Sequence, residues 1–556
     1  MNRSLSSNRK ILNILLRKGK RKNTSPRFGY FILYAFLYKY LSDKLKNHLI
    51  ECIEGNETDL ELFYRTEEGI QDLREWALND LGYFIESHSA YIDRFISDKF
   101  IEDIFSPEFF TILRDNIVFA PNNPAQDYFN RITEILKGEI RFYRFGFDED
   151  LNSFMSNYLF TLSKFDIGEK NFTYAQVYDV IASSRQIRMS TTPEYISNLI
   201  TSIVKSQKNI IGDAYDPFMK DGSILFKLYG DYPLSRVCGK EDNELYYYYS
   251  LIRAFIEDVD FTNISLYEEN AIKSMAVDSR LFDVIASKVP NRFNDYSRLA
   301  LKSQSIEIPH EGKSDFKEAL LSNFDMDKLS DDDEALKALK VLEEKYYEIE
   351  KKQMVSFTGE YESLSDSEFL FLINMINSLR EDGIMLVSLS QNFLFKSSLA
   401  LLRKFLTYEN NYIDAVISLP EELGRSVRPE VIILFRKDKR NDDIVFIDLS
   451  KKYGAVPSEN AFPGLFKRNL ILDDATTDKI IDAINNRRAV DKFSEIVSIR
   501  DLMKNDFNLA GSRYVDTYDG EFIRLKDLVN DKKMIDKEMD RLNTKINVLL
   551  DDLNIR

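Results

Sequence analysis

The stretch Arg236–Ile256, RVCGKEDNELYYYYSLIRAFI, places a short apolar strand directly before an apolar helix. The strand Arg236–Cys238 leads through a charged turn into the helix Tyr246–Ile256. Further strand-length apolar segments alternate with helical ones between Phe172 and Tyr453: Asn209–Ala214, Leu281–Ala286, Gly383–Leu389, Ile413–Leu419, Val431–Phe435 and Ile444–Leu449. This alternation predicts an α/β fold with a doubly wound, mostly parallel sheet.

The segments on either side of this core predict other structures. Apolar residues spaced near 3.6 in Phe31–Leu45, Ile70–Leu81 and Tyr91–Ile104 indicate helices. We therefore predict a helical N-terminal domain over 1–166, an α/β core over 167–455 and a C-terminal region over 456–556. A charged helix, Asp331–Gln353, interrupts the core and is expected to be a solvated insertion or lid.

A narrow apolar seam runs along the last predicted helix. Its members are spaced 4, 3, 4, 3 and 4 residues apart: Ile535, Met539, Leu542, Ile546, Leu549 and Leu553. Such an a/d seam, flanked by charged residues, is typical of a coiled coil and needs another helix to cover it. A helix of the same chain would serve, but a helix of a partner protein is favoured, so we expect a hetero-oligomer.

The charge distribution bears on nucleic-acid binding. The net charge of −16 argues against general affinity for nucleic acid. Nine basic residues nevertheless lie within the first 27 positions, ahead of the first acid, Asp43: Arg3, Arg9, Lys10, Arg17, Lys18, Lys20, Arg21, Lys22 and Arg27. Such an arm favours contacts with the phosphates of double-stranded DNA. A solvated tail and an organellar transit peptide remain alternatives.

Cysteine and histidine usage narrows the class of protein. The chain has two cysteines and three histidines, all scattered: Cys52, Cys238, His48, His88 and His310. This excludes a disulfide framework, fits a reducing cytoplasm and predicts no metal site. The apolar stretch Phe28–Leu41 is too short for a membrane span and contains Lys39, so it predicts a buried helix. No cleavable signal is evident.

Four motifs in the core follow the order of motifs in one known family. They are Arg188–Pro193 (RMSTTP), Asp216–Ser223 (DPFMKDGS), Gly239–Asn243 (GKEDN) and Phe282–Asn291 (FDVIASKVPN). Their counterparts G-E-[FY]-[YF]-T-P, D-P-x-C-G-S-G-S/G, G-x-E-x-N and F-D-x-x-x-A-N-P-P-[FY] belong to the modification (M) subunits of type I restriction–modification systems. The chain resembles these N6-adenine DNA methyltransferases, which implies a Rossmann-like methyltransferase core.

The resemblance continues towards the C-terminus. Leu379–Leu389 (LREDGIMLVSL) and Tyr412–Pro420 (YIDAVISLP) are similar to family segments. Asn505–Leu509 (NDFNL), followed by Ser512–Val515 (SRYV), closely matches the family's N-D-[FY]-N-L…R-Y-V and is the most specific feature. In the family, the C-terminal region packs against the specificity subunit that reads the DNA sequence. The resemblance therefore implies a specificity-type subunit, or another protein, as partner.

The resemblance also implies a site for S-adenosylmethionine. The matching residues are Thr192, Pro193, Asp216, Gly222 and Glu241. Lys220 replaces the first glycine of the cofactor loop, where a left-handed residue with a Cβ costs about 1–2 kcal/mol. Its side chain would also enter the pocket, so we expect cofactor binding to be weak or lost. Glu241 has two open roles, as acceptor for the ribose hydroxyls or as N-capping acid for the helix Tyr246–Ile256.

The segment that holds adenine in the family departs most from its pattern. NPPF is replaced by Lys288, Val289, Pro290 and Asn291. The family's asparagine accepts hydrogen bonds from the adenine amino group, and its aromatic residue stacks on the flipped base. Lys288 is a donor only, and its cation 4 Å from developing positive charge would cost about 4 kcal/mol at an effective dielectric constant of about 20. Asn291 removes stacking worth about 1–3 kcal/mol.

We therefore assign no catalytic residue and expect a silent M-like component of a type I or related phage-defence complex. A deprotonated Lys288, or a shifted loop that uses Asn291 and Phe293, would restore activity. An active adenine-N6 DNA methyltransferase with divergent motifs thus remains an alternative. A protein-binding scaffold without DNA contact is another.

Overall fold

The computed structural model describes residues 28–87, 114–143, 158–163, 173–182, 192–233, 235–271, 280–290, 371–372, 375–420, 430–450, 455–457, 470–517 and 525–552. All structural statements below concern these residues. The chain divides into two compact units, Met1–Val515 and Asp516–Arg556, and each is described by itself. The predicted domain boundaries near residues 166 and 455 remain predictions. The basic arm, the helix predicted at Tyr91–Ile104 and the charged helix Asp331–Gln353 lie outside the described residues.

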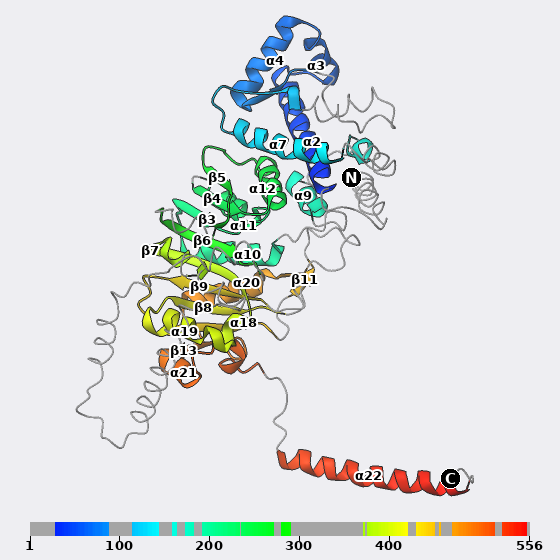
Figure 1. The fold of residues 1–556 in the computed structure, drawn as a ribbon, viewed down its shortest axis with the longest axis vertical. Coiled ribbons are helices and arrows are strands. Elements are labelled where there is room, and N and C mark those ends of the chain that lie inside the picture. The colour runs from blue at the N-terminus through cyan, green and yellow to red at the C-terminus, as the bar shows by residue number, and fades with distance from the viewer. Residues whose placement is uncertain are drawn as a thin grey trace, which may run out of the picture. The chain divides into compact units, whose positions relative to one another are not determined.

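A nine-stranded sheet forms the centre of the first unit (Figure 1). Its strands are β3 (Asp213–Asp216), β4 (Arg236–Glu241), β5 (Ile264–Glu268), β6 (Phe282–Lys288), β7 (Leu379–Ser390), β8 (Ile413–Ser418), β9 (Glu430–Arg436), β10 (Asp443–Asp448) and β13 (Ser494–Ser498). Their spatial order is β13-β10-β8-β9-β7-β6-β3-β4-β5. Only β9 and β13 of these strands run antiparallel to their neighbours. The predicted α/β class and mostly parallel sheet are confirmed, whereas β5 and β13 were not predicted.

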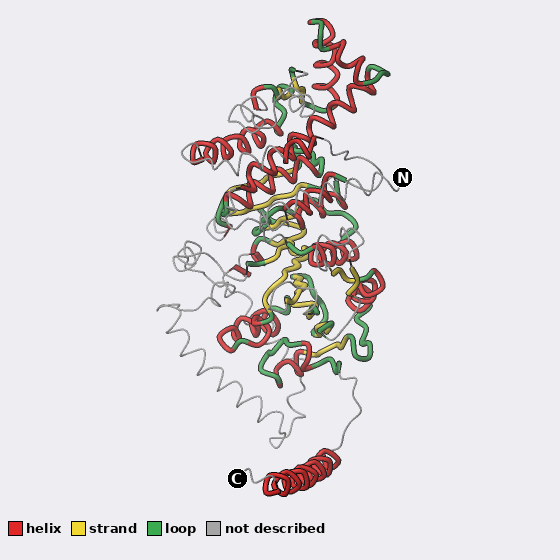
Figure 2. The backbone as a smooth tube through the Cα atoms, turned by 90° about the vertical axis from the view of Figure 1, so that its right-hand side faces the viewer, coloured by secondary structure: helices red, strands yellow, loops and turns green. Residues whose placement is uncertain are grey.

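Alternate side chains of the central strands enter two cores, one on each face of the sheet. Along β6, Val284 and Ala286 enter the first core and Ile285 enters the second. Helices α10 (Glu194–Gln207), α11 (Ser223–Asp231), α12 (Glu244–Ile256) and α20 (Asp474–Asn485) contribute to the first core. Helices α18 (Asn392–Phe395), α19 (Ala400–Lys404) and α21 (Ile499–Lys504) contribute to the second. Helices on both sides of the strands (Figure 2) explain why the strands are continuous apolar runs.

The N-terminal helices extend the first core. They are α2 (Phe28–Cys52), α3 (Glu57–Phe63), α4 (Glu67–Asp80), α7 (Ala125–Tyr143) and α9 (Tyr174–Ala182). A two-stranded sheet of β1 (Tyr83–Ile85) and β2 (Ile117–Phe119) lies among them and was not predicted. The remaining short elements are β11 (Ala455–Pro457), β12 (Leu470–Leu472), η3 (Ser397–Leu399), η4 (Phe405–Glu409) and η6 (Gly511–Arg513).

Helix α2 is buried on nearly all sides, as its aromatic sequence predicted. Tyr34 and Tyr38 are almost fully inaccessible, and α2 packs against α12. Lys39 is buried with them because its ammonium pairs with Asp43 one helical turn later, at 2.9 Å. Within the described part of the chain, no helix combines the length and apolar character needed to cross a membrane.

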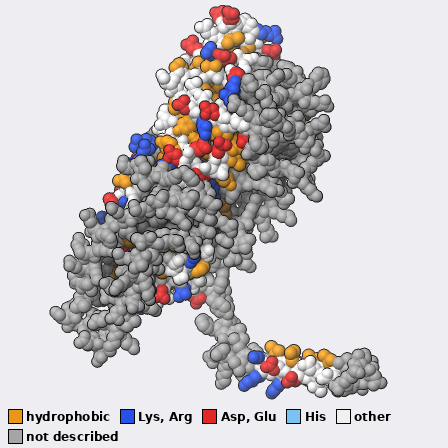
Figure 3. Space-filling view, in the orientation of Figure 1, with side chains coloured by type: hydrophobic (Ala, Val, Ile, Leu, Met, Phe, Trp, Pro, Cys, Tyr) orange, Lys and Arg blue, Asp and Glu red, His pale blue; other side chains and the backbone are white. Residues whose placement is uncertain are grey.

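Among its described residues, the second unit contains one long helix, α22 (Leu525–Asp552). Four members of the predicted seam, Ile535, Met539, Leu542 and Ile546, lie on it with 50–63% of their surface exposed. Figure 3 shows this apolar row along one side of the helix. The side chain of Leu549 and the residue Leu553 lie outside the described part. The helix itself is confirmed, and its covering by a partner remains a prediction.

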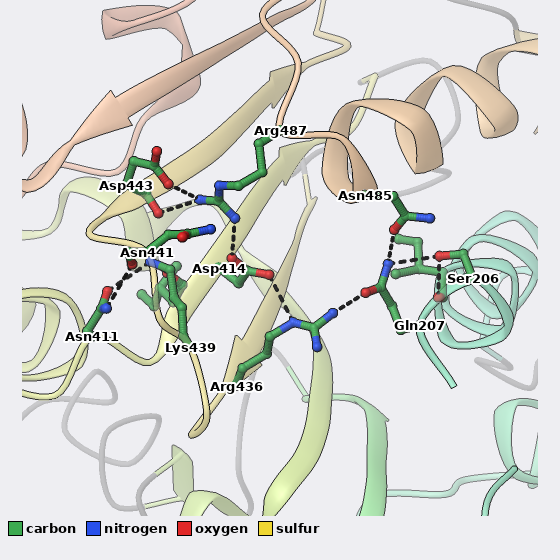
Figure 4. Close-up of polar contacts among 12 residues, drawn as sticks. Ser206, Gln207, Asn411, Asp414, Arg436, Lys439, Asn441, Asp443, Asn485 and Arg487 are labelled. Atoms are coloured by element: carbon green, nitrogen blue, oxygen red, sulfur yellow. Dashed lines mark hydrogen bonds and ion pairs between the residues drawn. The ribbon is translucent and has the colours of Figure 1, made fainter. Parts of the chain in front are cut away.

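A polar network closes the edge of the sheet where β8 and β10 begin (Figure 4). Asp414 of β8 accepts hydrogen bonds from Arg436 Nε at 2.9 Å and Arg487 Nη1 at 2.7 Å. Arg436 also donates to Gln207 at the end of α10, and Arg487 to Asp443 of β10. The network thereby ties α10 and the segment after α20 to the sheet. Ligands of such sheets bind at the opposite, carboxyl edge, so this network is structural.

Replacement of Asp414 by alanine should destabilise the first unit clearly. Both arginines would lose a buried carboxylate, and removing one partner of a buried pair costs on the order of 3 kcal/mol. Thermal denaturation should show a melting temperature several degrees lower. Asp482→Ala is the control, because its pair with Arg488 is exposed (42% and 66%) and such pairs contribute about 0–1 kcal/mol. Equal shifts for the two variants would contradict this role of Asp414.

Candidate functional site

The direction of the strand order reverses between β3 and β6. From β3 the sheet continues through β4 to β5 on one side, and from β6 to β7 on the other. At such a point the connections that follow two neighbouring strands run in opposite directions along the sheet. The crevice at the carboxyl ends of these two strands is where α/β sheets bind ligands. The loop after β3, Glu241 at the end of β4 and Lys288 at the end of β6 all lie at this edge. The fold thus brings together the segments singled out as cofactor-binding and adenine-binding.

The loop after β3 contains two left-handed residues. Gly222, the N-cap of α11, has φ +75°, and a Cβ there would lie 2.3 Å from the Phe226 ring. Lys220 has φ +52°. The position that the family fills with glycine is therefore left-handed here too, as predicted, and Lys220 adopts it at a cost of about 1–2 kcal/mol.

A buried ion pair anchors this loop. Asp221 is fully buried and accepts a hydrogen bond from Arg253 Nη1 of α12 at 2.7 Å. The same carboxylate accepts from the Ser223 hydroxyl at 3.2 Å. These contacts compensate the charge of Asp221 and fix the loop to α12. They thereby stabilise the chain directly after the strained residue Lys220.

Both carboxylate oxygens of Glu241 accept hydrogen bonds from the backbone. Asn243 N–H donates to Oε1 at 3.0 Å, and Lys220 N–H donates to Oε2 at 3.1 Å. Burial raises the pKa of Glu241 to about 7 despite these bonds. The N-cap of α12 is Asn243, whose side chain accepts from Leu245 N–H and Tyr246 N–H. The alternative of Glu241 as the N-capping acid is therefore wrong, and ribose hydroxyls would share its oxygens with the backbone.

Asp216 ends β3 and is almost completely buried. Its Oδ1 accepts hydrogen bonds from the Ser287 hydroxyl at 2.6 Å and from Phe218 N–H at 3.0 Å. Burial raises its pKa to about 7, and these two hydrogen bonds only partly oppose the rise. Asp216 thus connects the cofactor loop to the residue that precedes Lys288.

Lys288 is buried and forms an ion pair with Glu430, the first residue of β9. The pair spans three strands, because β7 lies between β6 and β9. Ser388 of β7 donates a hydrogen bond to the other oxygen of Glu430 at 3.4 Å. Burial lowers the pKa of Lys288, the pair with Glu430 opposes this effect, and the nearby cation of Lys220 adds to it. The pKa of Lys288 remains below its usual value.

Lys220 adds a cation to the site. Its charge acts on Asp216, Glu241 and Lys288. It favours the ionised form of the two carboxyls and disfavours that of Lys288. The position of a glycine in the family pattern thus carries a cation within reach of the other groups of the site.

The other predicted residues lie around this centre. Thr192 is buried just before α10, and the Pro193 carbonyl accepts from the first turn of that helix. Val289 is buried and donates its N–H to Ser388 at 3.1 Å, and Pro290 is half-buried. Asn291 and Phe293 lie outside the described residues, so the rescue through them remains a prediction. Glu430 was not predicted; the signal was a charged residue directly before the apolar run Val431–Phe435.

Asp283, which the family motif also contains, lies at the other end of β6. Its Oδ2 accepts from Gly212 N–H at 2.8 Å and Asp213 N–H at 3.0 Å, and its Oδ1 accepts from Arg380 at 2.7 Å. Burial raises the pKa of Asp283, but these three donors more than offset the rise, so the pKa lies below its usual value. Asp283 is therefore part of the scaffold.

The C-terminal motif is also structural within the first unit. The Phe507 carbonyl accepts from Arg403 Nε of α19 at 2.9 Å, and Phe507 itself is buried. Leu509 N–H donates to the Leu394 carbonyl of α18 at 2.9 Å. The Tyr514 ring packs on Phe446 of β10 with ring centroids 4.6 Å apart. The motif thus closes the second core.

Asp216→Asn should stabilise the chain more at high pH than at low pH. In the folded chain, a pKa raised from 3.8 to about 7 keeps Asp216 protonated below pH 7, while the unfolded chain ionises above about pH 4. Wild-type stability therefore falls as pH rises from about 4 to about 7 and this contribution is constant above. Asparagine keeps Oδ1 and carries no charge.

Between pH 5 and pH 8 the stability gained by Asp216→Asn should grow by on the order of 3 kcal/mol. Urea unfolding at the two pH values, followed by circular dichroism, measures it. Asp382→Asn, the same replacement at an exposed side chain, controls for general effects of pH. A gain of the same size at both pH values would show that Asp216 is not perturbed.

The comparisons with known proteins agree on one group. The family model N-6 DNA Methylase matches residues 342–521. The chain is 21% identical to the type I restriction enzyme MpnII methylase subunit of Mycoplasma pneumoniae, over 95% of this chain and 93% of that protein. It is 31% identical to the MjaVII methylase subunit of Methanocaldococcus jannaschii, but over 23% of this chain and 22% of that protein.

A solved structure extends the likeness to the fold. The type I restriction–modification methyltransferase subunit of Streptococcus thermophilus matches with a TM-score of 0.63 and 20% identity, covering 92% of this chain and 98% of that one. At this identity the match establishes the shared fold. The resemblance predicted from the motifs is thereby confirmed: along nearly its whole length, this chain is similar to the methylase subunits of type I restriction enzymes.

Proposed function

We propose that this chain is an M-subunit-like component of a type I restriction–modification or related defence complex, in which adenine methylation has been lost and assembly with DNA and partner subunits is retained. The observation that carries the proposal is the buried Lys288–Glu430 pair at the carboxyl end of β6. It occupies the position where the family places the asparagine that accepts from adenine.

The pair opposes base binding in two ways. Lys288 offers donors only, so it repels the amino protons that an asparagine oxygen would accept. A base that reached this position would also have to separate Lys288 from Glu430. Breaking a buried ion pair costs about 3–5 kcal/mol, which lowers occupancy by a factor of about 10² to 5 × 10³. The repulsion of about 4 kcal/mol applies to an unpaired lysine. In the structure the repulsion is smaller, because Glu430 neutralises most of the charge of Lys288.

The cofactor side of the site supports weakened binding of S-adenosylmethionine. That molecule is a sulfonium cation, and Lys220 places a second cation among Asp216, Glu241 and Lys288. The two oxygens of Glu241 already accept backbone hydrogen bonds. Some family residues of the cofactor site are retained: Thr192 and Pro193 before α10, and Asp216 and Gly222 around the loop after β3. We propose vestigial binding through these residues.

Assembly is supported by the relatives and by α22. The named relatives are subunits of type I restriction enzymes, and the apolar row on α22 is exposed. We propose that a helix of a specificity-type subunit, or of another protein of the complex, covers this row. DNA contact through the basic arm of residues 1–27 rests on the sequence alone.

One observation favours a second candidate, an active adenine-N6 DNA methyltransferase. Glu430 brings a carboxylate, an acceptor, to the same place as Lys288. In an active enzyme Glu430 would accept the amino protons of adenine, and Lys288, with its lowered pKa, would be its neutral neighbour. The two candidates therefore differ in what Glu430 does.

Methyl transfer distinguishes the candidates. The purified chain, assembled with its specificity-type subunit and double-stranded DNA, should transfer no tritium from methyl-labelled S-adenosylmethionine above the level of DNA alone. Transfer by the wild type, lost at least a hundredfold in Glu430→Gln, would overturn the silent subunit and support the second candidate. Glu381→Gln is the matched control, since Glu381 is 90% exposed.

Cofactor titration by calorimetry tests the same proposal without the reaction. Lys220→Gly removes both the cation and the side chain, and should bind S-adenosylmethionine at least tenfold more tightly than the wild type. Lys220→Met keeps the side chain without the charge and separates the two effects. Unchanged weak binding in both variants would mean that Lys220 is not the obstacle.

A single added charge tests whether the apolar row on α22 is an interface with a partner. Leu542→Asp should prevent assembly with the specificity-type subunit, because it places a carboxylate in an interface that must be dry. Thr544→Asp adds the same charge about 160° further around the helix, given 100° per residue. Analytical ultracentrifugation of the mixed proteins measures the outcome. Assembly that survives Leu542→Asp would exclude this row as the interface.

A further inference from the structure

Three side chains from two N-terminal helices converge at one point. His48 and Cys52 lie one turn apart on α2, so they share a face, and Asp80 ends α4. His48 Nε2 lies 3.4 Å from Cys52 Sγ and 3.1 Å from Asp80 Oδ2. All three candidate ligand atoms lie within 4.8 Å of one another.

The geometry does not fit a nucleophile with its base. In a catalytic Cys–His–Asp arrangement, the thiol and the carboxylate contact opposite ring nitrogens of the histidine. Here both approach Nε2, which carries either one proton or one lone pair and can serve only one of them. Two ligand atoms that lie near the same nitrogen can instead coordinate one ion together with that nitrogen.

Two of the three separations are close to the edges of a coordination tetrahedron, and the third, between Cys52 Sγ and Asp80 Oδ2, is no more than 4.8 Å. Bonds of about 2.0–2.1 Å to nitrogen, 2.0–2.2 Å to oxygen and 2.3 Å to sulfur place nitrogen about 3.3–3.5 Å from oxygen and about 3.6 Å from sulfur. The observed 3.1 Å and 3.4 Å are each within about 0.2–0.4 Å of these edges. Small side-chain rotations would complete the fit.

The surroundings favour a cation that arrives from solvent. The side chains of His48 and Asp80 are 21% and 57% exposed, and Cys52 is half-buried. A thiolate, an imidazole and a carboxylate together suit zinc-class transition metals and not magnesium or calcium.

We propose that His48, Cys52 and Asp80 bind a zinc-class divalent metal ion that ties α2 to α4, with a fourth coordination position open to solvent. Each helix supplies at least one ligand, so the ion crosslinks two elements of the first core. The site is formed by residues other than those of the cofactor and adenine segments and is independent of the proposed function. Residues that seemed too scattered for a metal site are joined by the fold.

Cobalt(II) is the probe, because a cobalt–thiolate bond gives a charge-transfer absorption in the near ultraviolet. The full-length chain, freed of metal with a chelator, should take up one equivalent of Co²⁺ with this absorption, and Zn²⁺ should abolish it. Cys52→Ser should lose the band. His48→Gln and Asp80→Asn should each weaken binding at least tenfold. Cys238→Ser, at the other cysteine, is the control and should keep the band.

Two results would overturn the site: no charge-transfer band in the wild type, or a band that persists in Cys52→Ser. A second measurement holds even if Cys52→Ser fails to fold. Zn²⁺ should slow alkylation of Cys52 by iodoacetamide at least tenfold in the wild type and much less in Asp80→Asn, as peptide mass spectrometry would show. Equal alkylation rates with and without Zn²⁺ would likewise refute the metal site.

Discussion

Burial of the central sheet on both faces is the constraint on which the rest of the structure depends. Because alternate side chains of every central strand enter one of two apolar cores, charged groups have room only at the strand ends. At the amino edge the chain closes this space with ion pairs, such as Asp414 with Arg436 and Arg487. At the carboxyl edge, polar groups cluster around the reversal of strand order. Both edges are thus charged, and the topology makes only the second a ligand site.

Lys288 has a partner in the structure, Glu430, that the sequence did not predict. Lys288 alone predicts strong repulsion of a cationic transition state. Glu430 lies 142 positions later, and neither spacing nor periodicity indicates that two intervening steps in the sheet bring the residues together. Pairing lowers the repulsion but adds a different obstacle, since a buried pair must be broken before a base can enter. The role of Lys288 remains a prediction, to which the structure adds the partner Glu430.

The sequence predicts the sheet well and its edges poorly. Each of the seven apolar runs overlaps a strand, because strands buried on both faces leave a strong signal. β5 and β13, whose sequences ISLYE and SEIVS are short and mixed, lack that signal. The left-handed backbone of Lys220 was predicted correctly, because a motif position that needs glycine indicates such a conformation; its effect on cofactor binding remains a prediction. His48 and Cys52 were interpreted as scattered, because the predicted helix ended at Leu45 and the packing of α4 on α2, which brings Asp80 to them, leaves no signal in the sequence.

The buried charged residues of the switch point have hydrogen-bond or ion-pair partners within the chain. Lys288 has Glu430, Glu241 has the backbone of Lys220 and Asn243, and Asp216 has Ser287. In a site that binds a cofactor and a base, some of these groups would lack a partner in the absence of ligand. The ligand would then supply their hydrogen bonds and compensate the desolvation of these groups. Here burial raises the pKa values of Asp216 and Glu241 to about 7, while the described partners are supplied by the chain itself. A ligand would have to replace contacts that already exist, so affinity gained from new hydrogen bonds would be small. The same contacts stabilise this edge of the sheet, so the edge keeps its structure without hydrogen bonds from a ligand.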